Sequence, residues 1–270
     1  MKKNVFLILA LVGLIWSCST PDEPGTTLLS YYTSYNFTPE FLNGQLKSEQ
    51  ELSYWATENN DSYEKGAKLT AEELQELGWT LDCISSFDMD GNIVQTKYFL
   101  DDNRFNIWDV ESLDGKIVKA TYTGNDTVRS YQKLDYEGST MMVSNYKLPE
   151  DELTRNFEIT TNEAGIATKL ELFTPENELI SYFLYELNDE NRVIGYKRFN
   201  AQDSLLTYSE LTYNDEGFFT KHTSFDGEGK VLSGIDLEYL TYDDNGNWLT
   251  VIGAAFDGPK LIFERKYEYY

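Results

Sequence analysis

The sequence predicts an all-β fold: a long twisted antiparallel β-meander of hairpin repeats, with one short helical insert near the N-terminus. The first supporting observation is that two residue types recur every 26 positions. They are asparagine, at Asn162, Asn188 and Asn214, and phenylalanine, at Phe173, Phe199 and Phe225. A fixed period with turn-forming residues at a fixed phase is typical of repeat architectures. Each unit holds two turns, so it corresponds to two strands.

The second observation is the even spacing of turn-forming residues from Asp90 to Pro259, where clusters of Gly, Asn and Asp mostly fall 11 to 14 residues apart. These residues tolerate positive φ angles or bond back to their own backbone. The segments between them are rich in Tyr, Phe, Val, Ile, Leu and Thr, which favour strands. Because no long connection interrupts the series, sequential hairpins fit it better than a Greek-key sandwich.

The third observation is alternation within single strands. After Gly246, residues Trp248, Ile252 and Phe256 fall on one parity. A sheet with one buried and one wetted face produces this pattern. We therefore expect these side chains to share the buried face.

Two of the turns carry a family resemblance. Tyr213-Asn-Asp-Glu-Gly217 and Tyr242-Asp-Asp-Asn-Gly246-Asn247 resemble the Tyr-Asp-x-x-Gly-Asn core of YD (Rhs-type) repeats. The chain also resembles uncharacterised β-hairpin repeat lipoproteins of diderm bacteria, whose mature part opens with a strand similar to Leu42-Asn-Gly44-Gln-Leu46-Lys47. The resemblance implies a fold of stacked hairpins and implies no activity.

The N-terminus has the pattern of a lipoprotein signal peptide over residues 1–17. Lys2 and Lys3 precede an uncharged apolar run, Val5 to Trp16, that is too short to span a membrane. The run ends at a small residue followed by Cys18, which resembles a bacterial lipobox and predicts lipidation of Cys18. An ordinary signal peptide with an incidental cysteine is the alternative. Acyl chains on Cys18 would make the lipid bilayer a partner of the protein.

The segment behind Cys18 predicts the address and the domain division. Ser19 resembles an outer-membrane sorting residue, and Asp22-Glu23 is similar to short signals that send lipoproteins to the cell exterior. Residues 18–35 have the composition of a flexible tether, and residues 36–270 form a single hairpin-repeat domain. With Cys18 acylated, Cys83 cannot form an intramolecular disulfide, and we expect a buried, inert thiol there.

Residues 56–78 interrupt the strand rhythm. Thr70-Ala-Glu-Glu73 is a capping-box pattern, which predicts a helix over 71–77 that ends at Gly78. Glu58 to Gly66 has the composition of a loop. We expect this insert to cap one end of the sheet, because stacked repeats leave an apolar face open at each terminus. A functional lid is the alternative.

The charge balance excludes one class of partner. The chain has 22 Lys and Arg against 46 Asp and Glu, so removal of Lys2 and Lys3 gives 20 − 46 = −26 for the mature protein. A surface this acidic repels nucleic acid and anionic headgroups. We therefore expect no nucleic-acid partner.

No catalytic, cofactor or metal set can be assembled from the motifs. His222 is the single histidine, and we expect it on a strand in contact with solvent. The segments that begin at Asp88 and Asp243 resemble the first half of a calcium loop, but the closing position holds Phe99 or Ala254 instead of Glu, so an EF-hand is excluded. A weakly bound calcium at these turns stays open. The sequence therefore predicts a protein that is not an enzyme and has no cofactor.

Aromatic residues supply the remaining functional signal, with 20 Tyr, 15 Phe and five Trp. Aromatic rings on a sheet can stack on sugars or anchor a protein. The candidates are Trp55, Trp79, Trp108 and Trp248, and ordinary cross-strand packing is the alternative. We expect an outer-membrane, lipid-anchored lipoprotein that faces either the exterior or the periplasm, acting as a binding or scaffold module for a glycan or a protein. An assembly component using strand addition and a carboxylate-based, glycan-directed hydrolase are the alternatives.

Overall fold

The computed structural model describes residues 42–59, 62–79, 81–101, 104–255 and 258–270. They form seventeen strands and one short helix, α2 (Ala71–Glu76). The strands are β1 (Leu46–Asn59), β2 (Ser62–Lys68), β3 (Cys83–Phe87), β4 (Ile93–Phe99), β5 (Phe105–Leu113), β6 (Lys116–Gly124), β7 (Thr127–Glu137), β8 (Thr140–Lys147), β9 (Glu152–Thr161), β10 (Ala167–Phe173), β11 (Leu179–Leu187), β12 (Val193–Asn200), β13 (Leu205–Tyr213), β14 (Phe219–Asp226), β15 (Val231–Tyr242), β16 (Trp248–Ala255) and β17 (Lys260–Tyr269).

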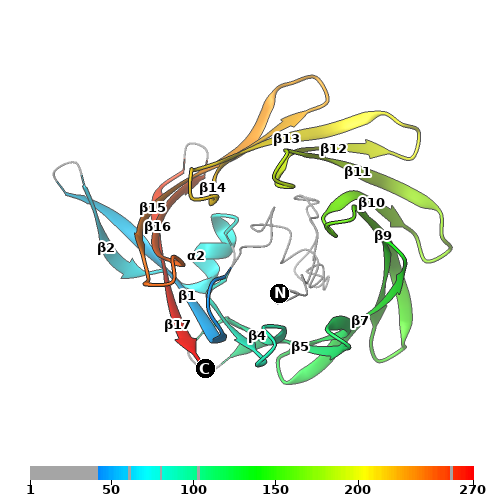
Figure 1. The fold of residues 1–270 in the computed structure, drawn as a ribbon, viewed down its shortest axis with the longest axis horizontal. Coiled ribbons are helices and arrows are strands. Elements are labelled where there is room, and N and C mark those ends of the chain that lie inside the picture. The colour runs from blue at the N-terminus through cyan, green and yellow to red at the C-terminus, as the bar shows by residue number, and fades with distance from the viewer. Residues whose placement is uncertain (1–41, 60–61, 80, 102–103, 256–257) are drawn as a thin grey trace.

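Sixteen of these strands close into an antiparallel barrel, which Figure 1 shows as a ring. From β3 to β17 each strand pairs with the next one in the chain. β1 closes the ring, because it pairs with β17 along Leu46–Trp55 and with β3 along Ser48–Glu51. The far half of β1 pairs with β2, which projects from the ring as a hairpin arm.

The elements of the predicted antiparallel meander are confirmed, and the sheet closes into a barrel, which the sequence did not predict. The strands are antiparallel, sequential and joined by tight turns, and the described part of the chain after residue 85 contains no helix. An open sheet exposes the backbone groups of its two edge strands, and closing the sheet on itself removes both edges. Here β1 and β17 close the barrel by pairing at nine positions.

The 26-residue step corresponds to alternate hairpin turns, as predicted. Asn162, Asn188 and Asn214 each accept a hydrogen bond at Oδ1 from the backbone N–H four residues later. The turns at Gly217 and Gly246 have φ angles of 91° and 84°, a region that favours glycine. All of these turns lie at one end of the barrel, here called rim B. The turns after β8, β10 and β12 lie at the opposite end, here called rim A.

The helical insert identifies the inner face of the barrel. α2 lies inside the ring (Figure 1), and Trp79 just after it packs on Phe263 with ring centroids 4.8 Å apart. Cross-strand partners share a face of the sheet. Phe263 pairs with Val251 on β16, and successive cross-strand pairs continue around the ring to Glu51 on β1. The side chains in this series identify the inner side of every strand of the ring.

Two predictions about the insert have different outcomes. The helix is confirmed with its capping box: Thr70 Oγ1 accepts from the Glu73 N–H, and Glu73 Oε2 accepts from the Thr70 N–H at 2.7 Å. The predicted loop from Glu58 to Gly66 is wrong, because residues on both sides of its tip pair as β1 and β2. The insert also packs inside a closed ring and so does not cap an open sheet.

The outer face carries charge pairs that join neighbouring strands, together with exposed apolar side chains such as Leu184, which pairs with Lys197. Lys119 binds Glu111 at 2.8 Å, Lys197 binds Glu186 at 2.5 Å, and Lys221 lies 3.5 Å from Asp236. Exposed ion pairs of this kind contribute little stability individually, but they make the outer face well suited to water.

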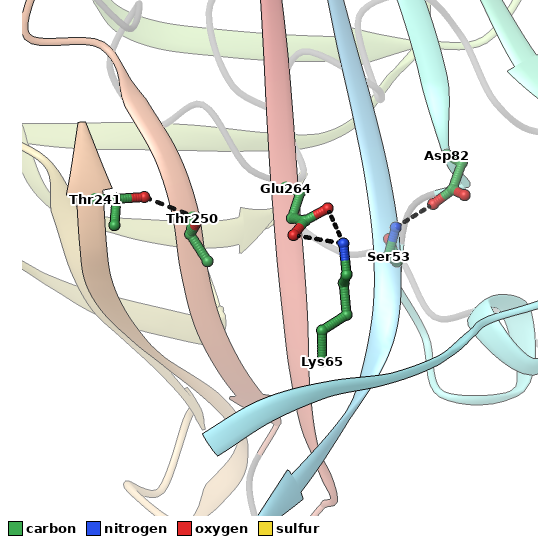
Figure 2. A network of polar contacts seen from close by, with 6 residues as sticks. All are labelled: Ser53, Lys65, Asp82, Thr241, Thr250 and Glu264. Carbon is green, nitrogen blue, oxygen red and sulfur yellow. Dashed lines mark hydrogen bonds and ion pairs between the residues drawn. The ribbon is translucent and has the colours of Figure 1, made fainter. Parts of the chain in front are cut away.

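The same side of the sheet near the β2 arm appears in Figure 2. Lys65 of β2 binds both carboxylate oxygens of Glu264 on β17, at 2.9 and 2.8 Å, and Thr241 donates to Thr250 at 2.9 Å. The Lys65–Glu264 contact fastens the arm to the ring.

Several expectations lie outside the described residues: the signal peptide, the tether of residues 18–35 and the lipidation of Cys18. Cys83 is buried, as predicted. No helix within the described segments has the length and apolar character required to cross a membrane.

Candidate binding site on the inner face

The inner face is built mainly from apolar side chains. One continuous cluster of buried residues runs along the ring from β3 to β14. Its members include Ile93, Trp108, Val110, Ala120, Leu134, Val143, Phe157, Ile159, Leu170, Leu172, Phe183, Tyr185, Tyr196 and Leu211. A second cluster packs α2 and Trp79 against β16 and β17. The alternation of side chains along each strand therefore places this apolar cluster on the inner wall and the charge pairs on the outer wall.

The four tryptophans named from the sequence belong to this inner wall or to its edge. Trp79, Trp108 and Trp248 are all less than 10% exposed. Trp108 packs on Tyr122 with centroids 5.2 Å apart, and Trp55 donates from Nε1 to Glu73 at 3.4 Å. Cross-strand and core packing thus account for their positions, and a stacking role for them stays a prediction.

A charged group on the inner face joins the last strand to the first. Nε of Arg265 lies 2.8 Å from a carboxylate oxygen of Glu49 and 2.9 Å from one of Glu51. The guanidinium also sits 3.8 Å from the ring centroid of Trp248. Because all three charged side chains are largely buried, these contacts keep two carboxylates and one cation compensated at the seam of the barrel.

His222 lies on the inner face, and the prediction that it contacts solvent is wrong. It is 1% exposed. Its Nε2 is 3.2 Å from the Tyr196 hydroxyl and 3.1 Å from Ser224 Oγ. Burial lowers the pKa of His222 to about 4, which keeps the imidazole neutral at pH 7.

A second arginine on the inner face forms no ion pair with any carboxylate of the described residues. Arg198 of β12 is half-buried, and its guanidinium lies 5.5 Å from the ring centroid of Phe183, its partner on β11. Among the described residues, its buried Nε finds no hydrogen-bond acceptor. Burial and the nearby positive charge of Arg155 both lower the pKa of Arg198.

Sequence analysis missed Arg198 because turn chemistry dominated the pattern. A usable signal was present, since Tyr196 and Arg198 fall on one parity of a short strand. A positively charged residue that shares a face with buried aromatic residues is unusual. The sequence does not show which parity of this strand faces inward, so this signal alone could not identify Arg198.

Among the described residues, the largely buried carboxylates of Asp82, Glu49 and Glu51 each lie beside a cation. Burial raises the pKa of Asp82, but its Oδ1 accepts from the Ser53 N–H at 2.8 Å (Figure 2) and its Oδ2 lies 3.2 Å from Lys68 Nζ. Glu49 and Glu51 both contact Arg265. Among the described residues, no group of three or more His, Cys, Asp or Glu side chains could hold a metal ion.

Comparison with known proteins gives no assignment by sequence: no family model and no curated protein matches the chain. Among solved structures, a porin-like protein from Bacteroides uniformis is 7% identical, with a TM-score of 0.40 over 84% of this chain and 98% of that chain. A porin-like protein from Bacteroides vulgatus is 9% identical, with a TM-score of 0.33 over 83% and 98%. A LolA-superfamily protein from Nitrosomonas europaea is 8% identical, with a TM-score of 0.20 over 84% and 87%.

These likenesses are too low to assign a function to this chain. The closed barrel overturns the predicted resemblance to YD (Rhs-type) repeats. The shared turn residues reflect hairpin chemistry that any antiparallel sheet can use.

Proposed function

We propose that the protein is a non-enzymatic binding protein of the cell envelope that holds an apolar or amphipathic ligand against the inner face of its barrel. The observation that carries this proposal is the apolar inner wall of a 16-strand ring. About eight strands already make a barrel that side chains can fill, and wider barrels enclose more space. α2 and Trp79 pack against β16 and β17, and the ligand would contact the wall from β7 to β12.

The outer face supports a barrel that faces water. A barrel embedded in lipid carries an outward apolar band about 25 Å tall. Here, outward charge pairs recur on β5–β6, β11–β12 and β14–β15. An apolar interior and a charged exterior suit a carrier that shields its ligand from water. A lipid-embedded pore would need the reverse arrangement.

The envelope address rests on the N-terminal sequence. We propose that Cys18 is acylated, and that the protein is anchored to the outer membrane and exposed to the exterior. Mass spectrometry of the native protein should find a mature N-terminus at Cys18 carrying acyl chains. An unmodified N-terminus at another residue would contradict the anchor and leave the barrel proposal intact.

The binding function can be tested with the uncharged fluorescent probe N-phenyl-1-naphthylamine. We expect saturable binding to the purified protein with increased probe fluorescence. Ala120→Trp adds an indole to the inner wall, and Thr121→Trp adds the same group to the outer wall, because Ala120 pairs with Val110 inside and Thr121 with Asp109 outside. Ala120→Trp should weaken probe binding, and Thr121→Trp should leave it unchanged.

Two outcomes would contradict the proposal. One is the absence of saturable probe binding by the folded protein. The other is equal binding by both tryptophan variants, with far-UV circular dichroism unchanged, because the probe would then lie outside the ring.

The alternative of strand addition has less support than it had from the sequence. Each of the sixteen ring strands is paired on both sides. Of the described strands, β2 alone keeps a free edge, and it carries Lys65 and Lys68. Lysine on an edge strand discourages pairing with another chain.

A further inference from the structure

The inner face contains two arginines that have no carboxylate partner in the described part of the chain, and they lie near the same rim. Arg198 is two residues from the end of β12, and Arg155 is three residues from the start of β9. Both strand ends lie at rim A. Within the described residues, neither arginine forms an ion pair, although the mature chain has far more acids than bases.

A buried hydroxyl lies beside Arg198. Ser181 of β11 pairs with Asn200, and Phe183 two residues later pairs with Arg198, so Ser181 and Arg198 are diagonal neighbours on the inner face. Such neighbours have Cα atoms about 7–8 Å apart, within reach of an arginine side chain. Ser181 is 1% exposed, and its Oγ has no hydrogen-bond partner among the described residues. Two unsatisfied donors, one of them charged, therefore lie together.

Arg155 adds a second positive charge on the same side. It pairs with Asn145, whose side chain bonds to Gln132 on the inner face. Its charge acts on Arg198, and its side chain is exposed near the rim. Deeper along the same strands, Ile159 and Leu170 form a cross-strand pair, Phe183 pairs with Leu170, and all three are buried. The donors thus stand between the rim and an apolar wall.

We propose that Arg198, Ser181 and Arg155 hold the oxyanion headgroup of an amphiphile, a carboxylate or a phosphate, whose apolar chain extends from rim A along the inner side of the barrel. This inference rests on the proposed binding function and specifies the ligand class. An oxyanion accepts charge-assisted hydrogen bonds from guanidinium and hydroxyl groups, and arginine matches its geometry. The headgroup would also relieve the repulsion between the two arginines.

The net charge of the protein favours an amphiphile over a free anion. A formal charge of −26 for the mature chain repels small anions from the surface. Burial of an apolar chain supplies a favourable free energy that inorganic phosphate lacks. The site should therefore bind a headgroup that arrives with its chain.

The test compares cis-parinaric acid, a fluorescent fatty acid, with its methyl ester. The two probes share a chain and differ in the negative charge. The wild-type protein should bind the acid more tightly than the ester. Arg198→Gln should weaken binding of the acid about tenfold to a hundredfold and leave the ester unchanged. The matched control is Lys197→Gln, which removes the adjacent cation on the outer face and should alter neither probe.

Milder variants keep the test informative if Arg198→Gln folds poorly. Ser181→Ala and Arg155→Gln should each weaken the acid selectively, by a few-fold. Circular dichroism checks the fold of each variant. Inorganic phosphate at millimolar concentration should fail to displace the acid.

The outcomes separate the headgroup site from the proposed function. Equal affinity of wild-type protein for acid and ester, or equal loss of both in Arg198→Gln, would overturn the headgroup site while the binding function stands. Displacement by inorganic phosphate would identify a site for free anions and overturn the amphiphile. Failure of both probes to bind would count against the binding function itself.

Discussion

Arg265 and Arg198 both lie on the inner face, in opposite electrostatic surroundings. Arg265 contacts Glu49 and Glu51 and covers the ring of Trp248. Arg198 contacts the ring of Phe183 and has a buried Nε without an acceptor among the described residues. The first cation is fully compensated by the protein, and the second is not. This difference distinguishes an arginine that joins two strands of the barrel from one that we propose contacts a ligand.

The position of Arg265 explains its compensation. It is the cross-strand partner of Glu51, so it joins β17 to β1 where the ring closes. The two walls also differ in packing, because α2 and Trp79 cover the inside of β16 and β17. The region around Arg265 is therefore covered by the helical insert, whereas the region around Arg198 is the one that we propose contacts a ligand.

The largest expected effect follows from removal of Arg265. Arg265→Met should lower the free energy of unfolding by about 3–5 kcal/mol, because two largely buried carboxylates would lose their shared cation. Urea denaturation followed by tryptophan fluorescence measures this change.

The control for this variant lies on the same seam. Lys47 is 3.7 Å from Glu268, and both side chains are more than half exposed. Lys47→Met should therefore change the free energy of unfolding by less than about 1 kcal/mol. Similar losses for the two variants would mean that burial of the Arg265 group does not matter.

The next largest effect is a loss of stability at acidic pH, and it involves His222, which lies on the inner face in the same region as Arg198. The pKa of His222 in the folded protein is about 4, below its usual value of 6.5, because burial favours the neutral ring. The unfolded chain therefore binds a proton that the folded protein does not between these values. The contribution of neutral His222 to the free energy of unfolding is complete above pH 6.5. It is lost as the pH falls toward 4, which lowers the free energy of unfolding by about 3 kcal/mol in total.

The measurement must separate His222 from the many titrating carboxylates. Unfolding free energies of wild type and His222→Gln are compared from pH 7 to pH 4. The difference between them should shrink by about 3 kcal/mol over this range, because glutamine does not titrate. A constant difference would show that His222 has an ordinary pKa in the folded protein.

The sequence predicted the local structure and could not predict the closure. Asn188 and Gly217 identify turns because their chemistry is local, and the capping box at Thr70 and Glu73 identifies a helix end for the same reason. Closure depends on pairing between residues more than 200 positions apart, such as Glu51 and Arg265, and no local pattern encodes it.

Register irregularities explain the errors in assigning faces. Trp248 and Ile252 share a parity in the sequence, but Trp248 packs inside with Val251, while Ile252 pairs with Glu238 on the outer side. The pairing of β15 with β16 shifts register between Thr241 and Tyr242, next to Trp248. A bulge of this kind moves side chains to the other face. The inward positions of His222 and Arg198 could be assigned only from the complete ring.

A smaller effect tests the packing difference between the two regions. A Cβ on Gly253 would lie 2.7 Å from Phe263 Cε2 and 3.0 Å from Trp79 Cη2. Gly253→Ala should therefore lower the free energy of unfolding by about 1–3 kcal/mol. Chemical denaturation measures this loss. A neutral result would show that the interior beside α2 can adjust, and would weaken the distinction between the two walls.

The smallest expected effect is the loss of Arg198 from the protein without ligand. Arg198→Gln gives up a cation–π contact with Phe183 but removes a partly desolvated charge that the protein does not compensate, so the two changes should cancel to within about 1 kcal/mol. Thermal unfolding should therefore give nearly equal midpoints for Arg198→Gln and wild type. Addition of cis-parinaric acid should then raise the wild-type midpoint more than that of the variant, because a ligand stabilises the folded state according to its affinity. A large loss of stability without ligand would place Arg198 in the same structural class as Arg265, and the contrast between the two arginines would no longer hold.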